Sequence, residues 1–310
     1  MLEHGGCLIE AARRFGIPVA DWLDLSTGIA PWPYPLPLPP PEVWQRLPEE
    51  NDGLEEAARA FYGAEVLPVP GSQWAIETIP RLLPPGRVMM PQPIYAEHPH
   101  AWAAAGHTRV GWDAPADYAV VCNPNNPSGE RYSRSELLSL AARVRLLVVD
   151  EAFIDAEPRE SLAGSGADNT LVLRSLGKFF GLAGVRLGFV LGPAAWRQRL
   201  RGHLSPWAVA HPARWAARLA LADRGWQAAQ RERLLAAARR LDATLRSLGT
   251  PAGCALFCYI ATPRAEALFE RLARCGILVR RFDDPPALRF GLPGDEAQWR
   301  RLEDALKDIG

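Results

Sequence analysis

Short apolar runs alternate with helix-like segments across residues 54–191 of this 310-residue chain. The runs read as strands because each is bounded by turn residues and is too short for a helix. They lie at 66–69, 88–90, 108–110, 118–122, 146–149, 170–174 and 186–191, with helical patterns at 54–62, 72–83 and 137–144. Since strands without a polar face must be covered on both sides, this order predicts an α/β fold with a mainly parallel sheet between helices.

Polar residues follow several of these runs, where each strand is expected to end. Ser72 and Gln73 come soon after the first run, the segment 123–126 after the fourth, Asp150 directly after the fifth and Ser175 after the sixth. Ligands of such sheets bind beside the carboxyl ends of the strands. We therefore expect the functional site at this edge of the sheet.

Lys178 lies between an apolar run and a glycine-rich turn, in a chain whose basic residues are almost all arginine. Lysine and arginine together number 35, yet the only lysines are Lys178 and Lys307. Arginine is always charged, whereas a partly desolvated lysine can lose its proton and act as an amine nucleophile. This favours a Schiff-base lysine at 178. The alternative is a surface lysine that was never replaced by arginine.

A Schiff-base lysine that works with pyridoxal phosphate needs several protein partners. These are donors and a cation for the phosphate, an acid for the pyridine nitrogen, an aromatic ring that stacks on the cofactor and a donor to its phenolic oxygen. The candidates are Ser72 and Gln73 with Ser175 and Arg186 for the phosphate, then Asp150, Tyr95 and Asn126. Each could also be an ordinary turn, cap or core residue.

Their order and spacing resemble a known family. VCNPNNPSG, VVDEAFIDA and RSLGKFFGLAGVRLGF are similar to the motifs of fold-type-I pyridoxal-phosphate enzymes of the histidinol-phosphate aminotransferase type. His4-Gly5-Gly6, DLSTGIAP, PIYAEH and DEAFID are more similar to the decarboxylase branch of that family, which acts on threonine phosphate in cobalamin biosynthesis. The resemblance extends over essentially the whole chain and implies an aminotransferase-like fold.

The resemblance implies a role for each matching residue. Lys178 matches the Schiff-base lysine, Asp150 the partner of the pyridine nitrogen and Asn126 the donor to the phenolic oxygen, with a place beside the substrate. The phosphate cradle and the stacking ring are matched by Ser72, Gln73, Ser175, Arg186 and Tyr95. The substrate-binding positions are matched by Arg289 for the carboxylate, Arg280 for the phosphate, and His4, Gly28 and Ile29 for the pocket lining.

Three positions depart from the aminotransferase pattern. Phe153 stands where a tyrosine is usual three residues after the aspartate, and Gly177 where serine or threonine usually precedes the lysine. Both departures fit the decarboxylase branch. Leu47-Pro48 replaces the Tyr-Pro that a neighbouring subunit usually offers to the cofactor phosphate, which weakens the expectation of that contact.

The implied activity is decarboxylation of L-threonine O-3-phosphate to (R)-1-amino-2-propanol O-2-phosphate, by a carboxy-lyase. One alternative is an aminotransferase of the histidinol-phosphate type. Another is a non-catalytic binding module with an aminotransferase fold. The formal net charge of zero argues against nucleic acid or an anionic membrane as a partner.

The remaining features concern organisation and location. We expect an N-terminal arm over 1–44 that adds to the small domain, a large cofactor-binding domain over 45–210 and a small α+β domain over 211–310. One long helix over 207–238 should lead from the large domain into the small domain. The small domain should also contain strands at 254–260 and 276–279 and helices at 265–273 and 298–306. The proline-rich segment 31–41 predicts an ordered extended arm over the body of the chain or over a partner.

The five cysteines form no metal-ligand array and suggest reduced thiols. The N-terminus lacks the pattern of a signal peptide, and no apolar run reaches membrane-spanning length. We therefore expect a cytoplasmic enzyme without a metal. The resemblance implies a homodimer.

Overall fold

The computed structural model describes residues 4–307. The chain forms two compact units. The larger unit comprises Pro33–Asn126 and Arg131–Arg231, and the smaller unit comprises the chain up to Trp32, Pro127–Glu130 and the chain from Glu232 onward. The domain boundaries predicted after residues 44 and 210 remain predictions.

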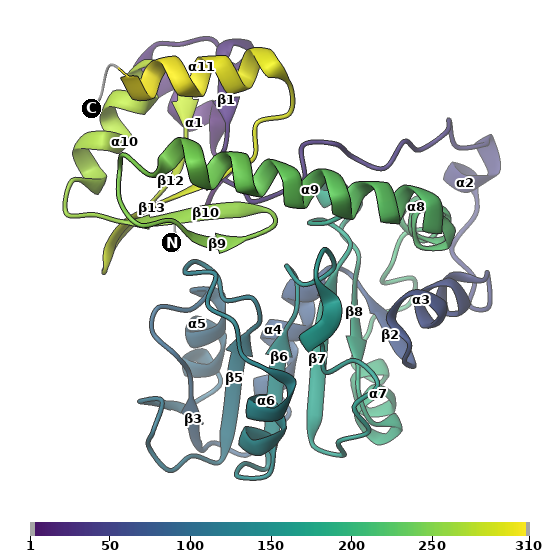
Figure 1. Cartoon of the computed structure of the whole chain (residues 1–310). Helices are drawn as coiled ribbons and strands as arrows, with labels where there is room; N and C mark the ends of the chain where they lie inside the picture. The colour runs from purple at the N-terminus through teal and green to yellow at the C-terminus, as the bar shows by residue number, and fades with distance from the viewer. Residues whose placement is uncertain (1–3, 308–310) are drawn as a thin grey trace. The chain divides into compact units, whose positions relative to one another are not determined.

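A seven-stranded sheet forms the centre of the larger unit, in the order β2-β8-β7-β6-β5-β3-β4 (Figure 1). The neighbouring strands from β4 to β7 run parallel, whereas β8 is antiparallel to both β7 and β2. The strands are β2 (Val66–Val69), β3 (Arg87–Met89), β4 (Thr108–Val110), β5 (Tyr118–Cys122), β6 (Leu146–Asp150), β7 (Thr170–Ser175) and β8 (Gly188–Leu191). The prediction of a mainly parallel sheet is confirmed.

Helices cover both faces of this sheet (Figure 1). The helices of the larger unit are α2 (Pro41–Gln45), α3 (Leu54–Tyr62), α4 (Ser72–Arg81), α5 (Glu97–Ala104), α6 (Arg134–Ala141), α7 (Ala194–Arg201), α8 (His211–Ala222) and the start of α9 (Arg224–Leu245), with 3-10 turns at Pro158–Glu160 and Ala183–Val185. Ile76 and Ile79 of α4 and Trp102 of α5 share a buried core with Val120 and Val148 of the sheet. Burial of each such side chain stabilises the fold by roughly 1.5–3 kcal/mol. This core therefore holds the strands, and with them the strand ends, in place.

The single helix predicted over 207–238 is wrong, because the segment forms α8 and α9. Asp223 separates them with a non-helical backbone. Its Oδ1 accepts from the N–H of Trp226 at 2.9 Å, and its carbonyl oxygen accepts from the N–H of Gln227 at 3.1 Å. An aspartate in this role satisfies the first donors of a new helix. Helix-forming residues on both sides concealed the break.

The proline-rich arm is ordered on the larger unit, as predicted. The backbone N–H of Tyr34 donates to the carbonyl oxygen of Phe180 at 2.8 Å. The Tyr34 ring also packs edge-on against Trp226, with 5.2 Å between the ring centroids. The arm then enters α2 at Pro41, where a proline suits the first helical turn.

The smaller unit contains an antiparallel sheet in the order β12-β13-β10-β9 and a short parallel pair, β1 with β11. The strands are β1 (Leu23–Asp24), β9 (Ala252–Cys254), β10 (Phe257–Ala261), β11 (Ile277–Leu278), β12 (Arg280–Asp283) and β13 (Pro286–Gly291). The helices are α1 (Leu8–Phe15), α10 (Ala265–Arg274), α11 (Glu296–Lys307) and the rest of α9, with a 3-10 turn at Val19–Asp21. In the part of the chain described, no helix has the length and apolar character needed to cross a membrane.

One strand prediction in the smaller unit is wrong, one is confirmed, and two strands were not predicted. The run 254–260 is a tight hairpin of β9 and β10 rather than one strand. The strand predicted over 276–279 is present as β11 (Ile277–Leu278), whereas β12 and β13 were missed. At Gly253, a Cβ would lie 2.2 Å from the carbonyl oxygen of Phe257, so the hairpin closes only on glycine. Ala255 and Leu256 in the turn are apolar and gave no turn signal.

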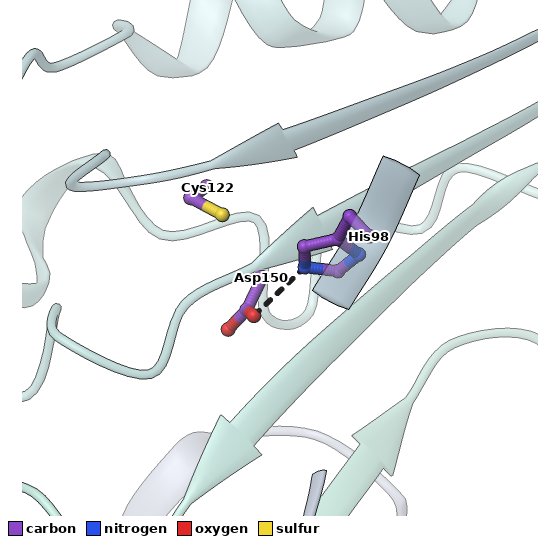
Figure 2. A group of neighbouring side chains, drawn as sticks. All are labelled: His98, Cys122 and Asp150. Atoms are coloured by element: carbon purple, nitrogen blue, oxygen red, sulfur yellow. Dashed lines mark hydrogen bonds and ion pairs between the residues drawn. The ribbon is translucent and has the colours of Figure 1, made fainter. Parts of the chain in front are cut away.

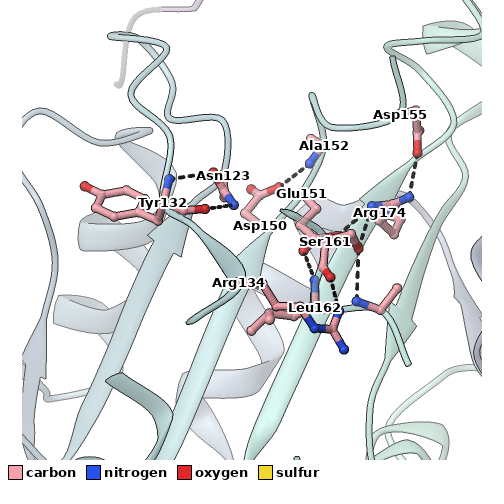
Figure 3. A network of polar contacts seen from close by, with 11 residues as sticks. Asn123, Tyr132, Arg134, Asp150, Glu151, Ala152, Asp155, Ser161, Leu162 and Arg174 are labelled. Atoms are coloured by element: carbon pink, nitrogen blue, oxygen red, sulfur yellow. Dashed lines mark hydrogen bonds and ion pairs between the residues drawn. The ribbon is translucent and has the colours of Figure 1, made fainter. Parts of the chain in front are cut away.

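A buried ionic network ties the segment after β6 to β7 in the larger unit (Figure 3). Arg174 of β7 donates to Glu151 at 2.6 Å and to Asp155 at 2.7 Å, and all three side chains are almost fully buried. Burial raises the pKa of both carboxyls, although the charge of Arg174 opposes this. Ser161 and the N–H of Leu162 also donate to Glu151, at 2.6 and 2.7 Å. Arg174 therefore fixes the course of residues 151–155.

Removal of this cation should destabilise the fold strongly. Arg174→Met leaves Glu151 and Asp155 buried without a counter-charge, which we expect to cost about 3–5 kcal/mol of unfolding free energy in urea titrations at neutral pH. Without the cation, the folded-state pKa of both acids rises further above the unfolded value. The folded state then binds more protons, so the stability of the variant should fall as pH rises from about 5 to about 8.

The matched control is Arg145→Met. Arg145 pairs with Asp117 at 3.5 Å, but its side chain is 72% exposed, so we expect a loss below about 1 kcal/mol. Equal losses in the two variants would contradict the role given to Arg174.

Candidate active site

The carboxyl ends of β5, β6 and β7 bring the predicted polar residues together in the larger unit. Cys122 ends β5 and is paired with Asp150, the last residue of β6. Asp150 is in turn paired with Leu173 of β7. Asn126 follows β5 and Lys178 follows β7. The expected edge of the sheet thus carries residues that are predicted to bind the cofactor.

Asp150 is a buried carboxylate held by two donors. Its Oδ2 lies 3.0 Å from Nε2 of His98, a buried side chain at the start of α5 (Figure 2). Its Oδ1 accepts from the N–H of Ala152 at 3.0 Å. Because a carboxylate only accepts, Nε2 of His98 carries the shared proton. This arrangement presents a fixed negative group, as a protonated pyridine nitrogen requires.

Cys122 completes the buried group in Figure 2. Burial raises the pKa of its thiol well above the usual range, and the charge of Asp150 acts in the same direction. The backbone N–H groups of Tyr95 and Asn126 donate to the sulfur. The ligand-type atoms of His98, Cys122 and Asp150 lie within 4.8 Å of one another. We interpret this group as a hydrogen-bonded support for Asp150, with a neutral thiol.

The loop after β5 is anchored on both sides of Asn126. Asn123 exchanges two hydrogen bonds with the backbone of Tyr132, at 2.9 and 3.1 Å. The side chain of Asn125 donates to the carbonyl oxygen of Pro93 at 2.9 Å. These bonds fix the loop relative to Tyr95, whose ring packs edge-on against His98. Neither asparagine had been given a role from the sequence.

The N-terminus of α4 forms the candidate phosphate cradle. The first amides of a helix have no partner within it, and the helix dipole favours an anion there. A Cβ at Gly188 would lie 2.5 Å from the backbone nitrogen of Ser72, and one at Gly71 would lie 3.0 Å from Nη2 of Arg186. Only glycine leaves this space around the amide and the guanidinium. The side chain of Gln73 bonds to Glu77 and Glu97, so its contribution is its backbone N–H.

Lys178 is half-buried in the turn after β7. Its Nζ lies 5.3 Å from the centroid of the Phe153 ring, a cation–π distance. Phe153 belongs to the segment that Arg174 holds. Ser175, at the end of β7, accepts a hydrogen bond from the N–H of Gly177 at 3.3 Å. A Cβ at Gly177 would lie 3.0 Å from Cα of Ala183, so glycine here permits a compact turn.

These residues fit pyridoxal phosphate. Space for a phosphate lies beside backbone donors and Arg186, and Asp150 is a buried acid whose donors keep it in place. Tyr95 is bonded through its backbone to the same thiol as Asn126. The roles of Ser72, Gln73, Tyr95, Asn126, Asp150, Ser175, Lys178 and Arg186 remain proposals.

The smaller unit brings together several predicted substrate residues. Nη2 of Arg289 donates to the carbonyl oxygen of Ser26 at 2.9 Å. The hydroxyl of Ser26 accepts from the N–H of Gly6 at 2.7 Å and donates to Asp24 at 2.6 Å. A Cβ at Gly5 would lie 2.3 Å from the same carbonyl oxygen of Ser26. The start of the chain and the DLSTG segment therefore pack beside Arg289.

Four further predicted substrate residues lie in the same unit, whereas Asn126 lies in the larger unit. His4 is exposed beside Gly5, and Gly28 takes a left-handed backbone (φ 63°) before Ile29. Arg280 stands over the Phe282 ring, with 5.2 Å from the guanidinium carbon to the ring centroid. The substrate roles of His4, Gly28, Ile29, Arg280 and Arg289 stay predictions.

Comparison with known proteins shows the family to which this chain belongs. The family model for aminotransferase class I and II matches residues 47–306. The chain belongs to this family. It is 54% identical to the threonine-phosphate decarboxylase of Pseudomonas aeruginosa, over 99% of this chain and 97% of that protein. It is 44% identical to the threonine-phosphate decarboxylase of a Sinorhizobium species, over 98% and 97% of the two chains.

A solved structure shares the fold. The histidinol-phosphate aminotransferase from Sinorhizobium meliloti, in complex with pyridoxal-5'-phosphate, matches 100% of this chain and 99% of its own, with a TM-score of 0.82 and 18% identity. This likeness confirms the fold-type-I architecture that the sequence predicted.

Within this aminotransferase-family chain, sequence reasoning missed His98 and Cys122. The role of each residue becomes clear only from its contacts in the folded chain. His98 lies three residues after Tyr95, one helical turn on, and Cys122 is the last residue of a buried strand beside Asp150. A histidine in a helix start and a cysteine in an apolar run are each ordinary core residues when read alone.

His98 should strengthen cofactor binding. Loss of a buried hydrogen bond to the charged Asp150 should raise the dissociation constant for pyridoxal phosphate about tenfold or more in His98→Phe. The measurement is a titration of cofactor-free enzyme, followed by visible absorption.

His107→Phe is the control. His107 is also buried, but its Nε2 lies 2.9 Å from the carbonyl oxygen of Pro80 and not beside Asp150. Cofactor affinity in this variant should stay near the wild-type value. A similar weakening in both variants would mean that His98 acts only through stability.

Proposed function

We propose that this protein is a pyridoxal-phosphate-dependent carboxy-lyase that converts L-threonine O-3-phosphate to (R)-1-amino-2-propanol O-2-phosphate, a step of cobalamin biosynthesis. The observation that carries the proposal is the 54% identity to a threonine-phosphate decarboxylase over 99% of this chain. Relatives named histidinol-phosphate aminotransferase are more distant, for example 36% identical over 71% of this chain for one from Mycobacterium tuberculosis. The enzyme is therefore assigned to the decarboxylase branch.

The larger unit supplies the proposed cofactor residues. Lys178 would hold the cofactor covalently, and the amides of Ser72 and Gln73 with Arg186 would hold its phosphate. When bound, pyridoxal phosphate serves as an electron sink for charge that develops at the substrate Cα. Asp150, fixed by His98, would keep the ring nitrogen protonated and so maintain that capacity.

The smaller unit supplies the proposed substrate residues. Arg289 would bind the carboxylate, and Arg280 would bind the phosphate. Holding both ends of the substrate fixes the rotation about its Cα, which is positioning catalysis. Departure of CO₂ leaves an electron pair at Cα, and the amine of Lys178 would deliver a proton there.

Phe153 favours this outcome over transamination. Its ring packs near Nζ of Lys178 at 5.3 Å, where a tyrosine would add a hydroxyl group. A phenyl ring has no hydroxyl group, so Phe153 cannot donate the hydrogen bond that a tyrosine at this position could donate. Arg174 holds the Phe153 segment through Glu151 and Asp155.

The reaction can be tested directly. Purified enzyme should show visible absorption from bound cofactor and should release CO₂ from L-threonine O-3-phosphate without a 2-oxo acid acceptor. Lys178→Ala should lower turnover by at least about 10²–10⁴-fold, the usual contribution of a positioned proton carrier. Lys307→Ala, which alters an exposed lysine paired with Asp304 at 2.8 Å, should leave turnover unchanged.

A strict requirement for 2-oxoglutarate would move the protein to the aminotransferase branch. A colourless protein without cofactor by mass spectrometry would contradict the proposal as a whole.

We further propose that the enzyme acts as a homodimer in the cytoplasm. Several large apolar residues of the larger unit are exposed, namely Leu38, Trp44, Leu47 and Trp207. Trp44 lies in α2, which packs against α8, and Trp207 lies shortly before α8. Large apolar side chains exposed on segments that are near one another in the chain or packed together favour a protein interface.

Disruption of this surface should yield monomers. Trp44→Glu places a charge among the exposed apolar residues and should shift the sedimentation coefficient from dimer to monomer at micromolar concentration. Ile9→Glu, at an exposed apolar residue of α1 in the smaller unit, is the control and should leave the dimer intact. A wild-type protein that sediments as a monomer would refute the dimer.

A further inference from the structure

Two arginines and a tyrosine form a row across the antiparallel sheet of the smaller unit. Arg280 of β12 is paired with Arg289 of β13, and Arg289 is paired with Tyr259 of β10. Residues directly opposite each other in antiparallel strands point to the same face, with Cβ atoms about 4.5–5.5 Å apart. The three side chains therefore leave the sheet along one line, with Arg289 in the middle.

The next arginine in the chain identifies the other face. Arg281 points away from the row, since successive strand residues alternate. Its guanidinium carbon lies 5.7 Å from the Phe269 ring of α10, and its nitrogens lie 3.3 Å from Glu266 and 3.2 Å from Asp283. Carboxylates therefore balance Arg281, on the helix-covered face. The row belongs to the opposite face.

Aromatic rings support the guanidinium groups of the row. The guanidinium carbon of Arg289 lies 5.1 Å from the Phe257 centroid and 6.0 Å from the Phe282 centroid. Arg280 uses the same Phe282 ring, at 5.2 Å. Stacking of this kind orients a guanidinium and leaves its edge available for an anion.

Tyr259 leans toward the arginines. Strands β10 and β12 are two strand spacings apart, or about 10 Å. Even so, the Tyr259 and Phe282 ring centroids are only 6.1 Å apart, in an edge-to-face contact. Residue 287 of the intervening strand, paired with Phe282, is an alanine, which leaves room for the contact. The Tyr259 ring thus reaches over β13 beside Arg289.

The hydroxyl of Tyr259 is buried and has no hydrogen-bond partner among the described residues. The side chain is 6% exposed. A buried polar group without a partner costs about 1–3 kcal/mol and calls for an explanation, such as a ligand. Burial also raises the pKa of the phenol. The hydroxyl therefore keeps its proton at neutral pH and remains a donor.

We propose that Tyr259 is a substrate-binding residue whose hydroxyl donates a hydrogen bond to the carboxylate of the amino-acid substrate, beside Arg289. This inference rests on the proposed decarboxylase function and on the carboxylate role of Arg289. The row then binds two anions in a fixed order: phosphate at Arg280, and carboxylate between Arg289 and Tyr259.

The spacing of the row suits a phosphorylated β-hydroxy amino acid. In threonine phosphate, Cα, Cβ and one ester oxygen separate the carboxylate carbon from phosphorus. That span is of the order of one strand spacing, about 5 Å. Arg280 and Arg289 stand on neighbouring strands. A substrate with a longer separation between its anions could not bind both arginines in the same way.

The substrate and the product provide a sharp test with the cofactor-loaded enzyme. Both carry the phosphate, but only the substrate carries the carboxylate. Tyr259→Phe should raise KM for L-threonine O-3-phosphate about tenfold or more, the usual effect of losing a hydrogen bond to a charged group. The inhibition constant of (R)-1-amino-2-propanol O-2-phosphate should stay within about twofold of wild type. Cofactor absorption should be unchanged, and the thermal midpoint should not fall, because the variant loses a buried hydroxyl that has no partner among the described residues.

Three control variants separate the possible roles. Tyr62→Phe removes another buried hydroxyl without a partner, far along the sequence in the larger unit, and should leave both constants unchanged. Arg280→Ala should weaken substrate and product alike, because both carry the phosphate. Arg281→Ala, on the opposite face, should weaken neither.

The outcomes decide between the possibilities. If Tyr259→Phe changes neither constant, changes both equally or lowers the thermal midpoint, the proposal for Tyr259 is overturned. If wild-type enzyme neither turns over the substrate nor is inhibited by the product, the decarboxylase function itself fails. That failure is visible before any variant is measured.

Discussion

The guanidinium of Arg174 is the contact on which the rest of the site depends. It lies in a strand and bonds to two acids of the segment that follows the neighbouring strand. That segment begins at Asp150 and contains Phe153, while the strand of Arg174 continues to Lys178. One cation thus fixes three groups relative to one another, namely the proposed acid Asp150, the ring of Phe153 and the amine of Lys178. Apolar residues in place of all three charged partners could give the same stability, but they would not tie the two segments at these points.

The sequence predicted the features that local patterns encode. The apolar runs 118–122 and 146–149 were correctly predicted as strands, and they form β5 and β6. The prediction was possible because a strand covered on both faces is apolar along its whole length. The same reasoning placed Asp150 and Lys178 at one edge of the sheet. The spacing of the motifs then predicted the cofactor and the reaction, which hydrophobic periodicity alone could not predict.

Other features depend on contacts between distant residues and were not predicted. His98 gains its role only from Asp150, 52 residues away in the chain. The break between α8 and α9 depends on one aspartate among good helix formers. Strands β12 and β13 were missed because they are short and flank prolines and charged residues, which read as a loop. These are cases in which tertiary structure outweighs local preference.

The two proposed sets of residues use different kinds of backbone. The proposed cofactor residues lie at strand ends, in the turns beside them or at the start of α4, where glycines such as Gly71 and Gly188 allow close approach. The substrate residues Arg280, Arg289 and Tyr259 lie within antiparallel strands, where pairing sets their separation. Sites on strands are held more rigidly than sites on loops, which suits a set that must fix both ends of one substrate.

The pairing of β12 with β13 has a consequence for how this protein can change over evolution. Consecutive arginines at 280 and 281 point to opposite faces. A one-residue insertion or deletion in the turn at 284–285 would shift the register and exchange their faces. The charge composition would be unchanged, yet the guanidinium of residue 281 would join the row and that of residue 280 would turn toward α10. The length of this exposed turn therefore decides which of the two arginines joins the row, although none of its residues belongs to the row.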